Sequence, residues 1–212
     1  DPHNATTSQT FTWNVTNPEP EAENDTGETG ENDILNVTAA NGVLANDSDP
    51  DGDDLSVTEF TNGTDTAAAG GTIAGNEGGS FTLNTDGSYT FTPGTDFDDL
   101  AVGESRTTSI NYTVSDGEGG TDTATLTITV NGANDAPTST AITGQSDADA
   151  DVITDFDVSG SFSDPDTNDT LVFSATGLPD GLTINPDTGV ISGTINNSAS
   201  QGGPNNNGIY SV

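Results

Sequence analysis

The sequence of 212 residues contains no cysteine, no methionine and no lysine, and it has a single arginine and a single histidine. Without cysteine, the chain can form neither disulfide bonds nor cysteine-ligated metal sites. With one cationic side chain against 35 acidic ones, it carries a formal charge of -34. A charge of this sign repels nucleic acid and anionic membrane surfaces, so the expected partners are cations, neutral glycans and other proteins.

The sequence also has few large apolar residues and no long apolar run. Leu, Ile, Val and Phe together number 39, and no stretch approaches the roughly 18 consecutive apolar residues of a membrane-spanning helix. Low apolar content with high net charge is typical of disorder. Here, however, the apolar residues alternate with Thr and Ser in segments bounded by Gly, Asn, Asp and Pro. This pattern predicts a folded all-β chain with a small core.

Residues 19–134 contain about seven short strand patterns with turn signals between them. Segments 33–38, 42–47 and 55–60 predict strands, and an Asp86-Gly87 turn predicts a hairpin. Two further segments alternate clearly and predict neighbouring strands, whose apolar faces comprise Ile110, Tyr112 and Val114 in one and Ala124, Leu126, Ile128 and Val130 in the other. This number of short strands is typical of a β-sandwich.

A second series of strand patterns follows residues 131–137, NGANDAP, which are predicted to be a linker. The patterns of this series cover residues 154–162, 170–176, 181–185, 189–195 and 208–212. Compared with the first series, this one lacks a final strand. Both series contain a related acidic element, DPDGDDL from residue 49 and DPDTNDTL from residue 164, which indicates related modules in tandem.

The segment TFTWNVTNP, residues 10–18, has the pattern of a complete strand, because Phe11, Trp13 and Val15 alternate with polar residues. The residues before it are polar and supply no sheet that would bury the one tryptophan. We therefore expect residues 1–18 to be an orphan closing strand, with residues 9–17 completing a neighbouring module. That neighbour is either the preceding repeat of a longer polypeptide or a second chain, as in donor-strand complementation.

Long motifs in both series resemble known modules. GVLANDSDPDGDDLSV, GSFTLNTDGSYTFTP and YTVSDGEGGTDTATLTITVNGANDAP, within residues 33–137, resemble the cadherin-like repeat of giant prokaryotic surface proteins and adhesins. SGSFSDPDTNDTLVFSATGLPDGLTINPDTGVISGT, within residues 135–212, resembles the dystroglycan-type cadherin-like, or Ig, module of the same proteins. The resemblance implies tandem Ig-like β-sandwiches, here residues 19–134 and 135–212, stiffened by Ca²⁺ in an extracellular stalk, adhesin or filament on the cell surface.

The acidic element of the first module is a candidate calcium loop. Acidic residues stand at every second position, with a glycine at the sixth, as at the opening of an EF-hand loop: Asp47, Asp49, Asp51 and Asp53. The twelfth position is Thr58 rather than glutamate, and strand patterns flank the loop, which excludes an EF-hand. Calcium is still expected, because crowded carboxylates repel one another and Ca²⁺ binds roughly 6 to 8 oxygen ligands. The alternative is a solvated acidic turn.

The resemblance also implies that calcium ligands from adjoining segments meet where modules join. For a second site, the expected ligands come from the acidic element, the linker and the loop SDGEGG: Asp164, Asp166, Asn134, Asp135 and Asp116. For the first site, Asp49 and Asp51 would be joined by residues of the segment NPEPEAEND and of the chain start: Asn24, Asp25 and Asp1.

The sequence contains several N-x-S/T sequons, the acceptors of N-linked glycans. The candidate sites are Asn4, Asn14, Asn36, Asn62, Asn111 and Asn168, and the same pattern occurs at Asn24, Asn46 and Asn196. Asn14 and Asn111 fall on the outward faces of predicted strands, where a glycan would fit. A chain this rich in Asn, Ser and Thr also produces sequons by chance.

No enzymatic activity is expected. His3 is the one histidine and lies in a polar stretch, although a hydrolase with two carboxylates is compatible with the composition. A structural module that binds neighbouring identical or related modules head to tail is the leading interpretation. The alternative is a carbohydrate- or peptide-binding adhesion module, for which exposed loop aromatics are typical, and here Phe97 is the one loop-like aromatic. The acidity has two open explanations, calcium loading and adaptation to high salt.

Overall fold

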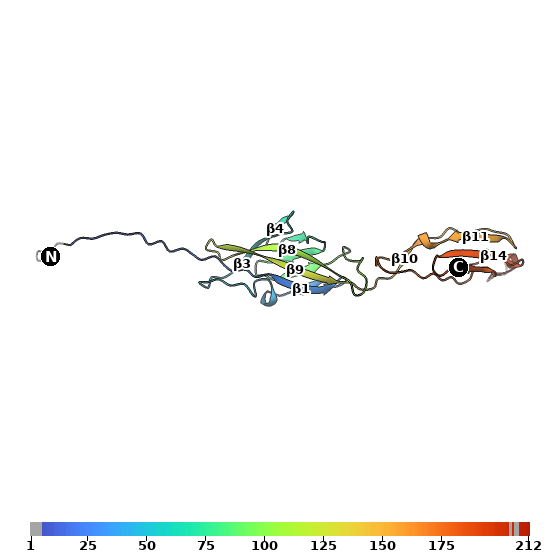
Figure 1. Ribbon diagram of the computed structural model, residues 1–212, viewed down its shortest axis with the longest axis horizontal. Coiled ribbons are helices and arrows are strands. Elements are labelled where there is room, and N and C mark those ends of the chain that lie inside the picture. The colour runs from blue at the N-terminus through green and yellow to red at the C-terminus, as the bar shows by residue number, and fades with distance from the viewer. Residues whose placement is uncertain (1–5, 204, 206–207) are drawn as a thin grey trace. The chain divides into compact units, whose positions relative to one another are not determined.

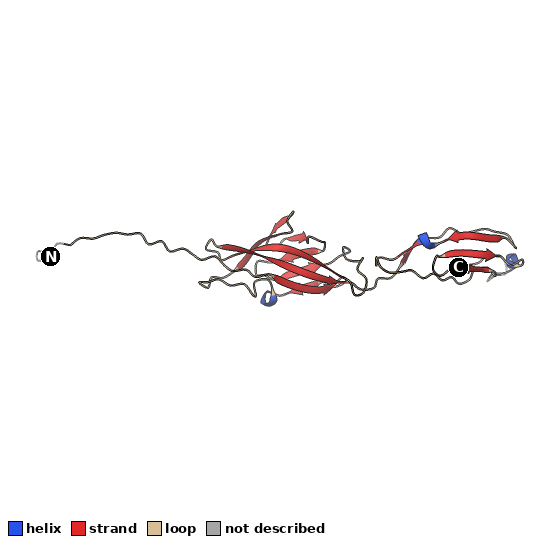
Figure 2. Cartoon of the chain, viewed as in Figure 1, coloured by secondary structure: helices blue, strands red, loops and turns tan. Residues whose placement is uncertain are grey.

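The structure is a computed structural model that describes residues 6–203, 205 and 208–212, and Figure 2 shows that strands dominate it. These residues group into two compact units (Figure 1). The first unit comprises the residues up to 95 together with residues 107–130, and the second comprises residues 96–106 and 131–212. The loop 96–106 thus groups with the second unit. The expected ligand Asp1, together with His3 and the sequon at Asn4, lies outside the described residues.

The first unit is a sandwich of two sheets. One sheet has the strand order β1-β9-β8-β3-β4 and the other the order β2-β7-β6-β5. The strand bounds are β1 Asp25–Gly30, β2 Leu35–Val37, β3 Ser56–Thr61, β4 Thr66–Ala68, β5 Thr72–Ala74, β6 Ser80–Leu83, β7 Tyr89–Thr92, β8 Ser105–Ser115 and β9 Thr121–Asn131. A turn of 3-10 helix, η1 (Ala39–Asn41), follows β2.

Alternation along the strands builds the core of this unit. Strands β8 and β9 each have 11 residues, and their buried positions recur at every second residue. In the opposite sheet, Phe81 pairs with Phe91 across β6 and β7, with ring centroids 4.7 Å apart. The predicted apolar faces of β8 and β9 are confirmed, since all their members are buried: Ile110, Tyr112, Val114, Ala124, Leu126, Ile128 and Val130.

The predicted hairpin is present, with its turn between β6 and β7. Gly87 adopts φ +80°, a left-handed conformation that favours glycine, and its N–H donates to the Asn84 carbonyl at 3.0 Å. Gly42 approaches this turn so closely that a Cβ on it would lie 2.2 Å from the Gly87 carbonyl oxygen. Val43 is buried although it lies in a turn rather than in a strand. The strand predicted at residues 42–47 is therefore wrong.

Strands β1, β4 and β5 were not predicted. Their sequences, DTGETG, TAA and TIA, lack the repeated large apolar side chains that mark a strand. Strand β1 is the sheet neighbour of β9. The N–H of Ala22 donates to Asp122 Oδ2 at 2.9 Å, and Asn24 Oδ1 accepts the N–H of Thr125 at 2.8 Å. The chain entering β1 therefore runs in the same direction as β9.

The second unit contains a three-stranded sheet of order β11-β14-β13 and a two-stranded sheet of β10 and β12. The bounds are β10 Thr138–Ser139, β11 Val152–Asp157, β12 Phe162–Ser163, β13 Leu182–Ile184 and β14 Val190–Thr194, with 3-10 turns η2 Ser159–Ser161 and η3 Ala199–Gln201. All of these strand pairs are antiparallel. The predicted strands at residues 170–176 and 208–212 are not part of a sheet within the described residues, which corrects those two predictions.

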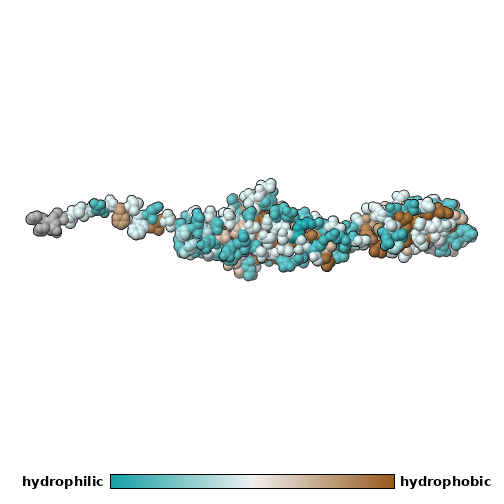
Figure 3. Space-filling view, in the orientation of Figure 1, coloured by the Kyte–Doolittle hydropathy of each residue, from teal (hydrophilic) through white to brown (hydrophobic). Residues whose placement is uncertain are grey.

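The two units differ in how well their apolar side chains are covered. In the first unit several core side chains have no exposure, whereas the best-buried apolar side chain of residues 131–212, Val158, is 5% exposed. The exposed large apolar residues of that region are Ile142, Val152, Val172, Ile209 and Val212. Figure 3 accordingly shows more hydrophobic surface on the second unit than on the first.

The segment before the first unit is not part of a sheet. Residues 6–20 form no strand in the structure, although residues 10–18 have the pattern of one. Phe11, Trp13 and Val15 are 82%, 76% and 84% exposed. The apolar face of the predicted strand is therefore uncovered.

Truncating a core side chain of the first unit should be far more costly than truncating an exposed one. We expect Phe91→Ala to lower the free energy of unfolding by about 3 to 5 kcal/mol, because it leaves a cavity between the sheets. The control Ile34→Ala, at an exposed position of the same unit, should change it by less than about 0.5 kcal/mol. Urea unfolding followed by circular dichroism measures both. Equal losses would contradict the sandwich core.

Candidate metal centres

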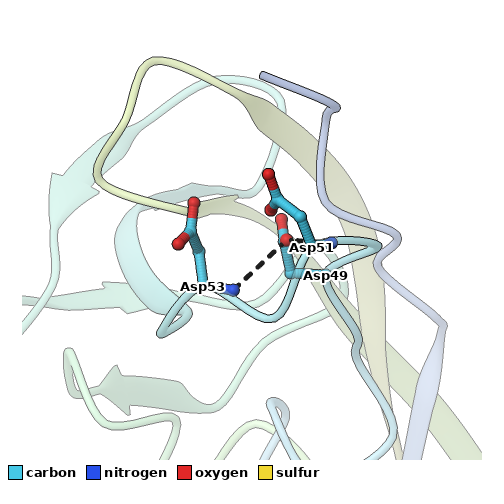
Figure 4. A group of neighbouring side chains, drawn as sticks. All are labelled: Asp49, Asp51 and Asp53. Carbon is cyan, nitrogen blue, oxygen red and sulfur yellow. Dashed lines mark hydrogen bonds between the residues drawn. The ribbon is translucent and has the colours of Figure 1, made fainter. Parts of the chain in front are cut away.

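The first candidate centre is the loop of residues 47–53, which leads into β3. Asp49 Oδ1 accepts the N–H groups of Asp51 at 3.0 Å and of Asp53 at 3.3 Å (Figure 4). It also accepts the N–H of Gly52 at 3.0 Å. Gly52 supplies the left-handed residue of this turn, with φ +88°. The turn brings one carboxylate oxygen from each of Asp49, Asp51 and Asp53 within 4.8 Å of the others.

Two oxygens of this loop are buried without a hydrogen-bond partner, namely Oδ2 of Asp47 and Oδ2 of Asp49. A buried carboxylate oxygen without a donor destabilises the folded state. A hard cation that prefers oxygen ligands would satisfy such an oxygen, and carboxylates are the ligands that Ca²⁺ takes. The donor set therefore fits calcium.

The chain segment before β1 is attached to the same loop. Glu21 and Ser48 exchange two backbone hydrogen bonds, of 2.8 and 3.0 Å, and the N–H of Glu23 donates to Asp47 Oδ1 at 2.8 Å. The Tyr112 hydroxyl donates to Asp25 Oδ2 at 2.8 Å. The structure thus places the segment beside the loop as expected. However, Asp25 is engaged by Tyr112 and is not part of the carboxylate cluster, and Asn24 Oδ1 accepts the N–H of Thr125.

Asp116 lies with the first unit, and its expected place at the second centre is wrong. Its Oδ2 accepts the side-chain amide of Asn17 at 2.7 Å, and its Oδ1 accepts the N–H groups of residues 118–120. The loop that carries Asp116 precedes β9, whereas the linker follows it. An 11-residue strand is about 35 Å long. Asp116 and Asn134 therefore lie at opposite ends of β9.

The second candidate centre is the loop after β12. One carboxylate oxygen from each of Asp164, Asp166 and Asp169 lies within 4.8 Å of the others. Asp166 is 2% exposed, and its Oδ1 is buried with no hydrogen-bond partner. Its Oδ2 accepts the N–H of Asp135 at 2.9 Å, which ties the loop to the linker. This orphaned oxygen, like those of Asp47 and Asp49, fits a bound cation.

The loop 96–106 meets the second centre within the same unit. The N–H and the hydroxyl of Thr167 both donate to the Asp99 carbonyl, at 3.3 and 2.8 Å, and the Asn168 amide donates to Glu104 Oε1. Arg106 forms an ion pair with Asp99 at 2.6 Å. The single arginine of the chain thus neutralises a carboxylate of the loop that packs on this centre.

Crowding of the carboxylates changes their proton affinity. A hydrogen bond from Asp51 lowers the pKa of Asp49, and the same bond, with burial and the charge of Asp53, raises the pKa of Asp51 to about 6. Burial, with the charges of Asp25 and Asp122, raises the pKa of Asp47 to about 6. Burial also raises the pKa of Asp25. Without a metal ion, the first centre therefore holds protons that isolated carboxyl groups would release.

Sequence reasoning missed Asp169, Asp122 and Asn17. Asp169 completes the cluster of the second centre, and its signal was an acidic residue five positions after Asp164. Asp122 and Asn17 tie the entering chain to the first unit, and no local pattern marks them. Asn134, an expected ligand, donates its amide to the Asp135 carbonyl at 2.8 Å.

The sequon side chains differ in their contacts. Asn14, Asn36, Asn111 and Asn168 are exposed, although the Asn168 amide donates to Glu104 Oε1. The Asn62 amide donates to the Ala74 carbonyl at 3.1 Å, and its Oδ1 accepts two N–H groups of the following turn. A glycan at Asn62 or Asn168 would replace one hydrogen of an amide nitrogen that already donates.

Phe97, the one loop-like aromatic in the sequence, does not form a recognition surface. Phe97 has no exposure, and the Arg106 guanidinium lies 5.6 Å from its ring centroid. Its place is in a packed interior rather than on a stacking surface. The alternative of a carbohydrate- or peptide-binding loop gains no support here.

Sequence comparison with protein families decides the classification. The family profile of the bacterial cadherin-like domain matches residues 17–132, more than half of the chain, and one described as "Putative Ig domain" matches residues 136–206. The chain belongs to the bacterial cadherin-like domain family. It is thus an extracellular-type cadherin-like and Ig-like module pair of the adhesion type. Among curated protein sequences, none matches this cadherin-like chain.

Solved structures of cadherin extracellular domains are similar to this chain. Mouse cadherin-23 EC22-24 is 15% identical with a TM-score of 0.51, covering 86% of the cadherin-like chain and 57% of its own length. Drosophila N-cadherin EC1-4 is 14% identical with a TM-score of 0.42, covering 81% and 39%. Protocadherin GammaB4 is 14% identical with a TM-score of 0.43, covering 84% and 29%. The chain therefore spans less than two thirds of each of these structures, and the cadherin-23 likeness shows the fold alone.

The described part of the cadherin-like chain holds no helix that is long and apolar enough to cross a bilayer.

The raised pKa values predict how the metal-free protein responds to pH. Between about pH 4 and 6, folded Asp47 and Asp51 keep protons that the unfolded chain releases, because their folded pKa values are about 6. The stability of the metal-free protein should therefore fall as pH rises through this window. Urea midpoints measured in chelator from pH 4 to 7.5 test this. The double variant Asp47→Asn, Asp51→Asn should flatten the profile, and a parent profile that rises over the window would contradict the assignment.

Proposed function

We propose that this chain is a structural module pair of a calcium-stabilised extracellular stalk, adhesin or filament at the cell surface, without enzymatic activity. One observation supports this above the others. In both modules, the equivalent acidic loop buries a carboxylate oxygen that has no hydrogen-bond partner, at Asp49 and at Asp166. In each of the two related loops, a cation would supply the partner that the buried oxygen lacks. A repeated module that depends on a metal ion requires such loops.

At the first centre, Asp47, Asp49, Asp51 and Asp53 would hold the ion. Asp164, Asp166 and Asp169 would do so at the second, with Asp135 positioning Asp166 through its N–H. A bound Ca²⁺ supplies two positive charges and accepts oxygen ligands that no donor among the described residues satisfies. Its effect is structural, because it fixes the segments around residues 21–25 and 131–137 against their loops.

The proposed neighbours are identical or related modules arranged head to tail. Residues 9–17 are proposed to complete one such module, because they present an uncovered apolar strand pattern. Glycans at exposed sequons such as Asn14 and Asn111 are compatible with an extracellular position. Cell-surface glycans or proteins are the further partners that an adhesion module would meet.

Removal of calcium should lower the melting temperature by roughly 10 °C or more, because an ion that binds the folded state alone stabilises it by mass action. The measurement is a thermal melt with and without chelator at fixed ionic strength. A matched sample with Mg²⁺ and monovalent salt separates a calcium site from general screening of the acidic surface. A melt that does not change in excess chelator would sink the calcium proposal.

Single substitutions should localise the ions. Asp49→Asn and Asp166→Asn keep an acceptor for the local N–H groups but remove a charged ligand, so each should weaken calcium binding at one centre on the order of 10- to 100-fold. Asp187→Asn, in an exposed turn, is the matched control and should leave both affinities unchanged. Calorimetric titration measures them. Equal losses in all three variants would mean that bulk charge rather than a site binds calcium.

A further inference from the structure

The second unit exposes more hydrophobic surface than the first (Figure 3). Residues 131–212 contribute five exposed large apolar side chains, at Ile142, Val152, Val172, Ile209 and Val212, whereas Ile34 is the one such side chain of the described residues 19–95 and 107–130. A contiguous apolar surface on a soluble module marks a place where another element packs. Incomplete coverage of large apolar side chains is therefore a feature of the second unit and not of the first.

Two segments of this unit run extended outside any described sheet. In residues 171–175, Leu171, Phe173 and Ala175 are half-buried and alternate with exposed residues, as in a strand. In residues 208–212, Tyr210 is half-buried, and its hydroxyl donates to the Ala199 carbonyl at 3.1 Å. The two segments meet at Gly177, where a Cβ would lie 2.3 Å from the Ser211 carbonyl oxygen. Residues 171–175 and 208–212 thus form a layer with an edge to which a further strand can be added.

The chain itself contains a strand of matching character. Phe11, Trp13 and Val15 alternate with Thr12 and Asn14, and all three apolar side chains are exposed. Residues 6–18 carry no charge, in a chain with 35 acidic residues. Residues 170–178 and 208–212 are also uncharged. These are the stretches through which two highly acidic copies can meet without bringing carboxylates together.

The donor strand lies at the end of the first unit that is opposite the linker. Asn17 is fixed to Asp116, at the end of β9 where that strand begins. Phe11 is six residues away and reaches at most about 20 Å from this anchor. Strand β9, with its 11 residues, places the linker about 35 Å from the same point. These lengths favour a second copy as the acceptor of the strand.

We propose that residues 9–15 of a second copy of this chain add a strand to the second unit, antiparallel to residues 208–212. Phe11, Trp13 and Val15 then face the apolar side of the β11-β14-β13 sheet, and Thr12 and Asn14 face solvent. Antiparallel pairing matches every strand pair described in this unit. This inference rests on the proposed function and specifies the partner of the module as a second copy. The two copies are either separate chains or successive repeats of one polypeptide. Because the contact is heterologous and does not close, repetition gives a filament.

The test compares the full-length chain with Trp13→Asp and with the matched control Asn14→Asp, which places the same charge on the opposite face of the same strand. Sedimentation velocity over a range of concentrations in saturating calcium measures association. The parent should form oligomers that grow with concentration, and Trp13 emission should shift to the blue as it becomes buried. Trp13→Asp should weaken association at least about 30-fold, while Asn14→Asp should assemble like the parent.

A second measurement uses a synthetic peptide of residues 6–17. The peptide should inhibit assembly of the parent and slow amide hydrogen exchange in residues 208–212, and a peptide with Trp13→Asp should do neither. A parent that stays monomeric at every concentration, or a Trp13→Asp variant that assembles like Asn14→Asp, would overturn the inference. The melt in chelator separates this from the proposed function: Trp13→Asp should retain its calcium response, and assembly without such a response would overturn the calcium proposal alone.

Discussion

Electrostatic repulsion among 35 acidic side chains, opposed by one arginine, is the constraint on which this structure depends. Hydrogen bonds from backbone N–H groups to carboxylates offset this repulsion. Asp49 accepts such bonds in its own loop, and Asp116 accepts them from residues 118–120. The described residues hold a single ion pair, between Arg106 and Asp99. Donors from the backbone satisfy one oxygen of a carboxylate more readily than both. At the two acidic loops, one oxygen each of Asp47, Asp49 and Asp166 remains buried without a hydrogen-bond partner, and there a divalent cation has a strong effect.

The small number of apolar residues is the second constraint, and these residues are divided unequally between the two units. The first unit gathers Phe81, Phe91 and the inward faces of two long strands into a core whose members are largely inaccessible to water. The three-stranded sheet of the second unit has fewer apolar side chains, most of them only half-buried, and several apolar residues elsewhere in residues 131–212 are exposed. An acidic, apolar-poor module of this kind gains more from a partner strand than from its own interior, because burial is its main source of stability.

Sequence patterns predicted the features that depend on neighbours in the chain. Alternation in β8 and β9, the Asp86-Gly87 turn and the acidic loops at Asp49 and Asp164 all follow from local spacing. Strand β1 was missed because DTGETG has no apolar alternation, and its pairing comes from β9 instead. Asp116 was assigned to the wrong centre for a related reason. Successive loops of a sandwich lie at opposite ends of its strands, so proximity depends on topology, which spacing alone does not contain.

The pairing of β1 with β9 determines how a module of this kind would carry a load. The chain enters along β1 in the same direction as β9, and it leaves at the far end of β9. A pull on the two ends of the first unit therefore acts parallel to these strands. All the hydrogen bonds between them resist together in shear, rather than opening one after another as in an unzipped hairpin. Resistance of this type slows forced unfolding, which is the property that a tethered extracellular stalk needs in flow.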